Sequence, residues 1–155
     1  AWSVFGGVAF MDSERKHSAY LDQVRKNANP GDYGTVDSTN GDELAFTPKV
    51  TANLWSTYDI NEKFTIGGGF QYVGSSWLGR PDDASRIIPN GRFGKLPAYF
   101  LAHAMATYKI NENVQVRLNV DNIFNKTYAV SSNWPGTRVT LGTPRTYRIN
   151  ASFKF

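Results

Sequence analysis

The sequence predicts an all-β protein, an antiparallel up-and-down barrel that crosses a membrane with its strands. Three observations lead to this fold class. The carboxyl-terminal residues alternate strictly between apolar and polar side chains, five earlier segments repeat the alternation, and short connections alternate with long ones. A period of two is the mark of a β-strand, because successive side chains point to opposite faces of a sheet.

The terminal strand is the clearest element. Its apolar members are Tyr147, Ile149, Ala151, Phe153 and Phe155, and its polar members are Thr146, Arg148, Asn150, Ser152 and Lys154. We expect the strand to run to the last residue and to end on an aromatic ring. A strand with lipid on one side and a polar lumen on the other, as in bacterial outer-membrane barrels, has this pattern.

Five further strands are predicted by the same alternation. The first is Trp2–Phe10, with Trp2, Val4, Val8 and Phe10 on one face, and the second is Lys49–Tyr58, with Val50, Ala52, Leu54 and Tyr58 on one face. The third is Phe64–Tyr72, the fourth is the mostly apolar Tyr99–Tyr108, in which His103 and Thr107 share a face, and the fifth is the strictly alternating Val114–Asp121. The pattern leaves no place for a long apolar helix.

The connections differ in length in a regular order. Residues 59–63 and 109–113 are short turns, and Thr57–Glu62 matches Thr107–Glu112 at every position but one. The others, 11–43, 79–95 and 125–142, are long and rich in the residues that turns need. A meander with this order has its short turns at one end, periplasmic in an outer-membrane barrel, and its long loops at the other, extracellular end.

The charged residues of the predicted strands fall on the polar faces. A Lys or Arg facing lipid at mid-bilayer would cost roughly 2–4 kcal/mol, so these faces should line the lumen. The side chains expected to face the lumen are Lys49, His103, Arg117, Asn119, Arg148 and Asn150. Tyr58, Phe64 and Tyr108 flank the short turns, where an interfacial aromatic girdle is expected.

Composition excludes several classes of protein. The chain has 155 residues and no Cys, so disulfides and thiolate metal sites are excluded. The formal net charge is +4, but the basic residues are scattered, which disfavours nucleic-acid binding. The sequence contains no run of about 18 apolar residues, so no membrane-spanning helix is expected. Residues 1–4 already have the pattern of a strand, so we expect a mature or truncated piece of a protein.

No motif predicts catalysis or a resident cofactor. Gly67-Gly-Gly69 lacks the Lys-Ser/Thr pair of a phosphate-binding loop and is interpreted as strand glycines at a bend of the barrel. His17 and His103 have no second His or Cys at ligand spacing, so no metal site is expected. Because no Ser-His-Asp set or carboxylate pair occurs on plausible strand ends, an enzyme is not expected.

Several segments together resemble the TonB-dependent outer-membrane receptors, of the type that imports ferric siderophores. They appear in the family's order between about Phe46 and Phe155. The segments are Ala52-Asn-Leu-Trp-Ser-Thr-Tyr58, Gly67-Gly-Gly-Phe-Gln-Tyr-Val-Gly74, Leu96-Pro-Ala-Tyr99, Ala104-Met-Ala-Thr-Tyr108, Leu118-Asn-Val-Asp-Asn-Ile-Phe-Asn-Lys-Thr-Tyr128 and Gly142-Thr-Pro-Arg145. His103 departs from the resemblance, which implies an acidic residue at this lumen position.

The resemblance implies a barrel of twenty-two strands with an amino-terminal plug domain and a TonB box. Since only six strands are counted, residues 1–155 are expected to be the carboxyl-terminal portion of such a barrel, without plug or TonB box. The implied partners are a ferric siderophore, outer-membrane lipid and lipopolysaccharide, and TonB through the missing amino-terminal part. Iron would enter only as a chelate carried by the ligand.

Loop residues are the candidates for ligand binding. Trp77, Arg80 and Arg86 lie in or beside the second long loop, and Trp134 and Arg138 lie in the third. Aromatic faces and guanidinium groups suit planar, anionic catecholate or hydroxamate chelates through stacking and charge-assisted hydrogen bonds. Each of these side chains could instead belong to an aromatic girdle, meet lipopolysaccharide phosphate or face solvent.

Two other classes of protein remain open from the sequence. One is a small self-standing outer-membrane barrel with a structural or adhesive role, which would need two more strands within Met11–Glu43. The other is a soluble β-sandwich binding module, whose strands alternate in the same way.

Overall fold

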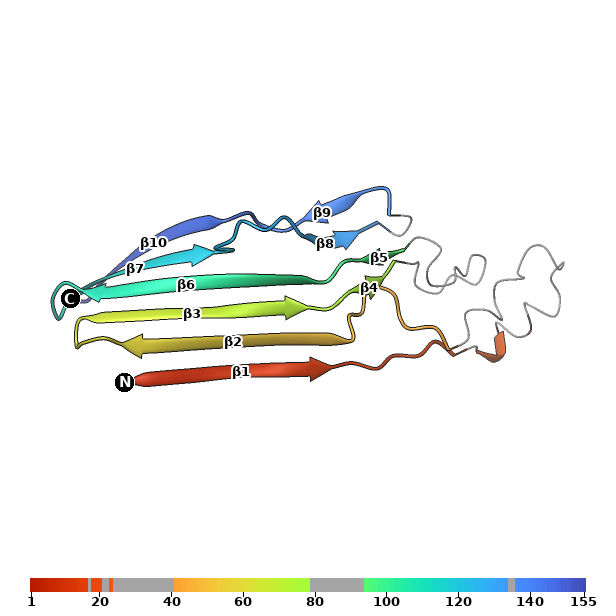
Figure 1. The fold of residues 1–155 in the computed structure, drawn as a ribbon, viewed down its shortest axis with the longest axis horizontal. Helices are drawn as coiled ribbons and strands as arrows, with labels where there is room; N and C mark the ends of the chain where they lie inside the picture. The colour runs from red at the N-terminus through yellow and green to blue at the C-terminus, as the bar shows by residue number, and fades with distance from the viewer. Residues whose placement is uncertain (17, 21–22, 24–40, 79–93, 134–135) are drawn as a thin grey trace.

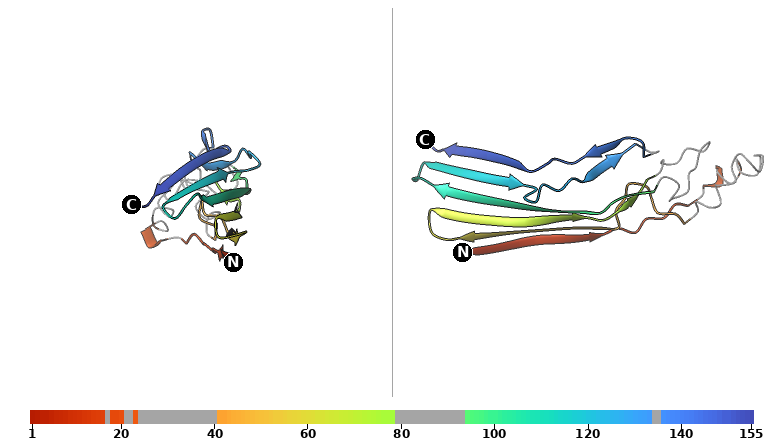
Figure 2. Two further views of the ribbon diagram at one scale, coloured as in Figure 1. Left: turned by 90° about the vertical axis from the view of Figure 1, so that its left-hand side faces the viewer. Right: turned by 45° about the horizontal axis from the view of Figure 1, so that its top comes forward.

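A computed structural model describes the chain except for residues 17, 21–22, 24–40, 79–93 and 134–135. Six long strands form one antiparallel sheet in the order β1-β2-β3-β6-β7-β10 (Figure 1). Their bounds are β1 Trp2–Phe10, β2 Val50–Asp59, β3 Phe64–Val73, β6 Tyr99–Lys109, β7 Val114–Asp121 and β10 Thr146–Phe153. The six predicted strands are thus confirmed, in an open, twisted sheet whose edge strands are β1 and β10 (Figure 2).

The terminal strand ends two residues earlier than predicted. Phe153 pairs with Val114, the first residue of β7, so no strand residue of β7 remains opposite Lys154. The Lys154 N–H still donates to the Asn113 carbonyl at 2.8 Å, in the turn before β7. The expectation of a strand up to Phe155 was wrong because a strand needs a partner as well as the right alternation.

Two of the long connections contain short hairpins that the sequence does not reveal. β4, Ser76–Trp77, pairs with β5, Lys95–Leu96, and β8, Ala129–Ser132, pairs with β9, Val139–Leu141. Strands of two to four residues are too short to show a period of two. These hairpins lie beyond the six-stranded sheet, at the end from which the long connections leave it (Figure 1).

The two short turns lie together at the opposite end and have the same construction. The N–H of Ile60 donates to Phe64 O at 2.9 Å, and the N–H of Ile110 donates to Val114 O at 2.9 Å. In each turn an Asn carboxamide oxygen accepts a backbone N–H two residues later, Lys63 to Asn61 and Asn113 to Asn111, both at 2.9 Å. The repeated sequence therefore encodes a repeated turn closed by its Asn side chain.

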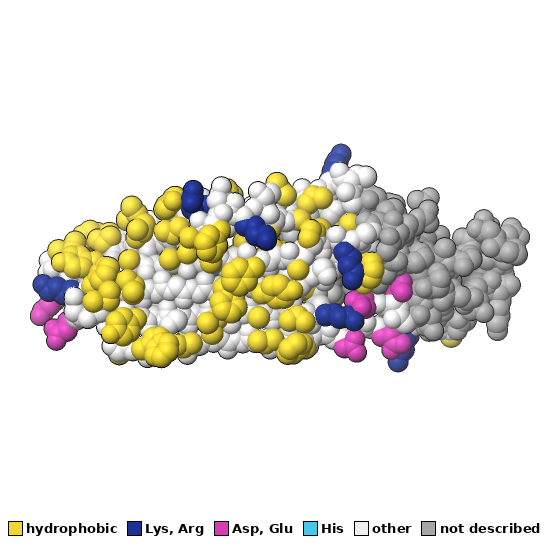
Figure 3. All heavy atoms as spheres, viewed as in Figure 1, with side chains coloured by type: hydrophobic (Ala, Val, Ile, Leu, Met, Phe, Trp, Pro, Cys, Tyr) yellow, Lys and Arg dark blue, Asp and Glu magenta, His cyan; other side chains and the backbone are white. Residues whose placement is uncertain are grey.

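The strand register divides the sheet into two chemically different faces. One row of neighbours runs Tyr58–Ile66–Ala106–Leu118–Ile149, and the parallel row on the other face runs Thr57–Gly67–Met105–Asn119–Arg148. We call these the apolar face and the polar face. The apolar face is exposed, with 74% at Ile149 and 78% at Phe10, and Figure 3 shows hydrophobic side chains spread across the strands.

No second layer covers the apolar face in the part of the chain that the structure describes. Among all the described residues, the only buried apolar side chains are those of Leu78, Leu96 and Leu101. A β-sandwich would bury one face of each sheet in a common core, so the soluble sandwich is not supported. Among the described residues, no helix has the length and apolar character needed to span a bilayer.

Aromatic rings gather on the apolar face beside the short turns. Phe64 and Tyr108 are opposite each other in the register, with ring centroids 6.4 Å apart in an edge-to-face arrangement. Tyr58 is exposed on the same face, and the Trp2 indole N–H donates to Ser56 Oγ at 2.7 Å. That bond gives the indole N–H an acceptor on an otherwise apolar surface.

We expect the two faces to differ in chemical accessibility in the complete protein. Single cysteines at Arg117 and Asn119 should react with a water-soluble maleimide, whereas cysteines at Val116 and Leu118 should not, because in the expected membrane barrel the apolar face meets lipid. A cysteine at the exposed turn residue Asn113 provides the positive control. The opposite pattern would show that the register is wrong by one residue.

Two neighbouring glycines should respond differently to an added methyl group. A Cβ on Gly69 would collide with the Leu54 carbonyl and the Trp55 ring, whereas a Cβ on Gly68 would meet nothing closer than 3.4 Å. Gly69→Ala should therefore destabilise the barrel by about 1–3 kcal/mol, and Gly68→Ala should be close to neutral. Urea unfolding in lipid vesicles measures both, and equal midpoints for the two variants would contradict the packing of Trp55.

Candidate functional site

The polar face carries a charged cluster where the long-connection ends of β7 and β10 lie beside the middle of β6. Asp121 ends β7 and pairs with Arg148 of β10, whose Nη2 lies 2.7 Å from Asp121 Oδ2. The His103 Nδ1 of β6 lies 3.6 Å from the other carboxylate oxygen, Oδ1. Both partners of Asp121 come from the neighbouring strands, so the cluster depends on the register of three strands.

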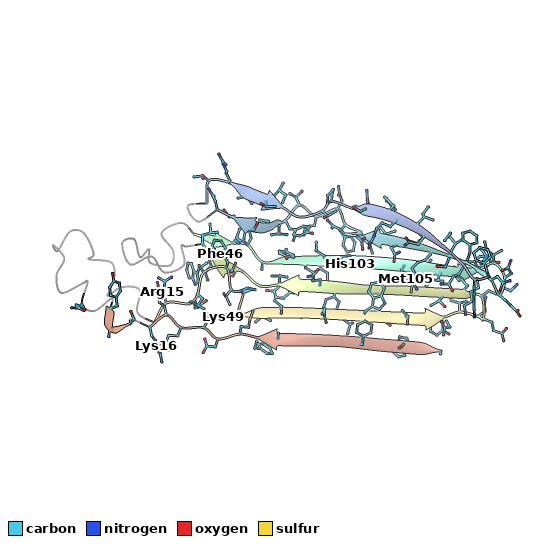
Figure 4. The ribbon with its side chains drawn as sticks, turned by 180° about the vertical axis from the view of Figure 1, so that it is seen from behind. Arg15, Lys16, Phe46, Lys49, His103 and Met105 are labelled. Carbon is cyan, nitrogen blue, oxygen red and sulfur yellow. The ribbon has the colours of Figure 1, made fainter. Side chains whose placement is uncertain are left out.

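His103 lies on β6 (Figure 4), and it acts as a hydrogen-bond acceptor in this cluster. The backbone N–H of Asn122 donates to His103 Nδ1 at 3.3 Å. The Asn122 N–H and Asp121 Oδ1 thus approach the same ring nitrogen, at 3.3 Å and 3.6 Å.

A hollow of ≈ 700 Å³ lies beside His103, toward β1. Its lining includes Phe5, Asn53, Trp55, Gln71 and His103, all on the polar face by register. Phe5 is 68% exposed there. The surface combines aromatic rings with amide and imidazole groups, which can bind a polar partner with an apolar part through stacking and hydrogen bonds.

Four of the remaining lumen candidates lie within strands on the polar face. They alternate with apolar residues along β7 and β10 and are Arg117, Asn119, Arg148 and Asn150. The Nε of Arg117 donates to Thr107 Oγ1 at 3.3 Å. Lys49 lies one residue before β2, where its Nζ is 2.7 Å from Glu43 Oε1. The hydrogen bond and the charge of Glu43 raise the pKa of Lys49 above its ordinary value.

The loop candidates are only partly described. Arg80, Arg86 and Trp134 lie outside the described residues. Trp77 belongs to β4, where its ring lies 3.9 Å from Lys95 Nζ and its carbonyl accepts the Phe46 N–H at 2.9 Å. One face of this indole is thus already occupied by a cation of the same hairpin.

Arg138 lies beside the other hairpin, immediately before β9. Its backbone N–H donates to Asn133 Oδ1 at 2.8 Å, and its carbonyl accepts the Asn133 N–H at 3.0 Å. These two bonds fix the backbone of Arg138 on the hairpin, and the residue is exposed. The structure places Trp77 and Arg138 on separate hairpins.

The sequence analysis missed the two residues that organise the end of β7, Asp121 and Asn122. Asp121 pairs with Arg148, and Asn122 is 3% exposed with a positive φ of 52°. A polar pair at the end of an alternating strand, followed by another Asn at 125, is the signal that could have indicated them. The residue types alone do not show which carbonyl groups, distant in the sequence, lie close enough to Asn122 to accept its hydrogen bonds.

Among the described residues, no group of three or more His, Asp or Glu side chains is placed to hold a metal ion. The polar groups of the site are instead engaged with one another, as in Asp121 with Arg148.

Comparison with known proteins identifies the fold family. The family model described as "TonB dependent receptor-like, beta-barrel" matches residues 1–123. The whole chain is 31% identical to the Catecholate siderophore receptor Fiu of Escherichia coli K12, of which it covers 18%. Over 82% of its length it is 29% identical to the Probable TonB-dependent siderophore receptor PiuA of Acinetobacter baumannii, of which it covers 15%.

A solved structure supports the same relationship. The closed form of the ferric-catecholate import receptor Fiu from Escherichia coli K12 superposes on the whole chain with a TM-score of 0.68 at 28% identity, over 19% of its own length. The chain therefore spans less than a fifth of the relatives named here. From the family match, the chain belongs to the β-barrel of the TonB-dependent receptors, which are proteins of the Gram-negative outer membrane.

Proposed function

We propose that this chain is the carboxyl-terminal part of the barrel of a receptor that imports a ferric siderophore across the outer membrane. The observation that carries the proposal is the division of one sheet into an exposed apolar face and a polar face bearing the charged side chains. Relatives described as siderophore receptors match the full chain or most of it. The relatives named are receptors, and we expect this protein to be a receptor rather than an enzyme.

The dimensions of the sheet support a membrane-spanning role. Its six strands contain between 8 and 11 residues, and about 9–11 tilted residues are needed to cross a bilayer. The apolar face would meet lipid, and the polar face would line the lumen with His103, Arg117, Asn119, Arg148 and Asn150. The short turns would be periplasmic and the long connections extracellular.

In this orientation the long connections form part of the mouth that captures the ligand. Arg138 projects from the β8–β9 hairpin, and Trp77 lies on the β4–β5 hairpin. Together with Arg80, Arg86 and Trp134, these side chains suit an anionic, aromatic ferric chelate. Iron would be cargo within the siderophore, and no resident cofactor is proposed.

The rest of the receptor would supply the remaining parts of the transport cycle. A plug domain and a TonB box would belong to the amino-terminal part, and TonB would act there. Lipid would contact the apolar face, and lipopolysaccharide would contact the extracellular margin of the barrel. The alternative of a small structural or adhesive barrel has no support in the relatives, which are large receptors.

Loss of a loop arginine should weaken capture of the ligand. In the complete receptor, Arg80→Ala, Arg86→Ala and Arg138→Ala are made singly, and binding of the ferric complex of a tris-catecholate is measured on cells at fixed ionic strength. Loss of a charge-assisted contact of about 1.5–3 kcal/mol corresponds to a Kd roughly ten- to a hundredfold higher.

The matched control is Lys63→Ala, which removes a positive charge at the short-turn end and should leave the Kd unchanged. Receptor levels are compared by immunoblotting of outer membranes. If all three arginine variants bind with the wild-type Kd at normal receptor levels, these arginines are surface charges and do not contact the ligand.

A further inference from the structure

Asn122 closes the base of the third long connection. It follows β7 directly, its φ is 52°, and its side chain is almost completely buried. Its Nδ2 donates to Lys126 O at 2.9 Å and to Thr143 O at 3.2 Å, while its Oδ1 accepts the Lys126 N–H at 2.9 Å. One carboxamide thus joins the beginning of the connection to its end.

Further contacts cross between the same two segments. Asn125 Oδ1 accepts the Arg145 N–H at 3.0 Å, and Arg145 Nη1 donates to Ile123 O at 3.3 Å. The Gly142 N–H donates to Tyr128 O at 2.9 Å. We call residues 122–128 together with 142–146 the clasp.

The Tyr128 ring explains why the clasp needs a glycine. A Cβ added to Gly142 would fall inside that ring, so only glycine allows the two segments to approach this closely. The other side of Tyr128 meets Tyr99 of β6, with ring centroids 4.6 Å apart. The clasp is therefore packed against the sheet as well as bonded across itself.

The clasp is also tied to the polar face. The Asn122 N–H donates to His103 Nδ1 on β6, and β6 lies in the middle of the sheet. Between the two halves of the clasp lies the β8–β9 hairpin, next to Arg138. Asn122 thus connects both halves of the clasp with the sheet.

We propose that Asn122 is a positioning residue: it holds the β8–β9 hairpin where it can take part in ligand capture. The proposal rests on the proposed receptor function. Asparagine suits the position because it tolerates a positive φ and offers two N–H donors and one acceptor in a single small side chain. Aspartate has the same shape but no donors, and it would direct a carboxylate at two carbonyl oxygens.

The test measures the position of the hairpin directly. These 155 residues contain no Cys, so in the complete receptor, with every cysteine outside them replaced by serine, spin labels are attached through Ser131→Cys on β8 and Ser152→Cys on β10. Electron–electron double resonance should give one narrow distance distribution in the parent and a broad one in Asn122→Asp. Asn122→Gly keeps the positive φ and removes only the side-chain bonds, so it should broaden the distribution too.

Asn113→Asp is the matched control, since it makes the same chemical change at an exposed turn residue. Among the described residues, the Asn113 side chain forms no hydrogen bond. A further variant, Asn125→Gly, changes an exposed position with φ 50° and removes a single bond of the clasp. It provides the test if the Asn122 variants do not insert into the membrane. It should broaden the distribution as well.

The second readout is ferric tris-catecholate binding and uptake. If the correctly placed hairpin falls to about one-tenth of the population, the Kd rises about tenfold while the maximal uptake rate per receptor changes little. An unchanged distance distribution in Asn122→Asp, Asn122→Gly and Asn125→Gly overturns the proposal, and so does a broad distribution with an unchanged Kd. A wild-type receptor that binds no ferric siderophore refutes the proposed function separately, because that measurement does not involve Asn122.

Discussion

The division of one sheet into an apolar and a polar face is the constraint on which the rest of the structure depends. Side chains alternate along each strand, so a register shift of one residue would turn Arg117 and Arg148 toward lipid and Leu118 and Ile149 toward the lumen. A cation in the middle of the bilayer would cost roughly 2–4 kcal/mol. The difference between the lipid and the lumen thus fixes the register of β7 and β10, although no buried apolar core packs against these strands.

The two ends of the sheet are held by different means. At the short-turn end, Asn61 and Asn111 close two nearly identical turns with their own side-chain oxygens, and each turn uses contacts within a few residues. At the long-connection end, Asn122 bonds to carbonyl groups 4 and 21 residues away. Local bonds suffice for a turn, whereas a long connection needs bonds between distant segments to give it a defined position.

The polar face is stabilised by pairing rather than by burial of apolar surface. Arg148 is paired with Asp121, Arg117 is bonded to Thr107, and His103 accepts the Asn122 amide. Since Arg148 remains 62% exposed, its ion pair with Asp121 contributes at most about 1 kcal/mol. The main effect of these bonds is to fix the direction of the polar groups on this face.

The sequence by itself determined the six strands, the two faces and the ends at which short and long connections lie, because each depends on a local period or on residue types within a few positions. The contacts of Asn122 with Thr143, of Tyr128 with Gly142 and of Asp121 with Arg148 were decided only by the tertiary structure. The end of β10 at Phe153 and the small β4–β5 and β8–β9 hairpins were likewise not evident. These features depend on which distant backbone groups lie opposite one another, and the pairing of strands through space determines that arrangement.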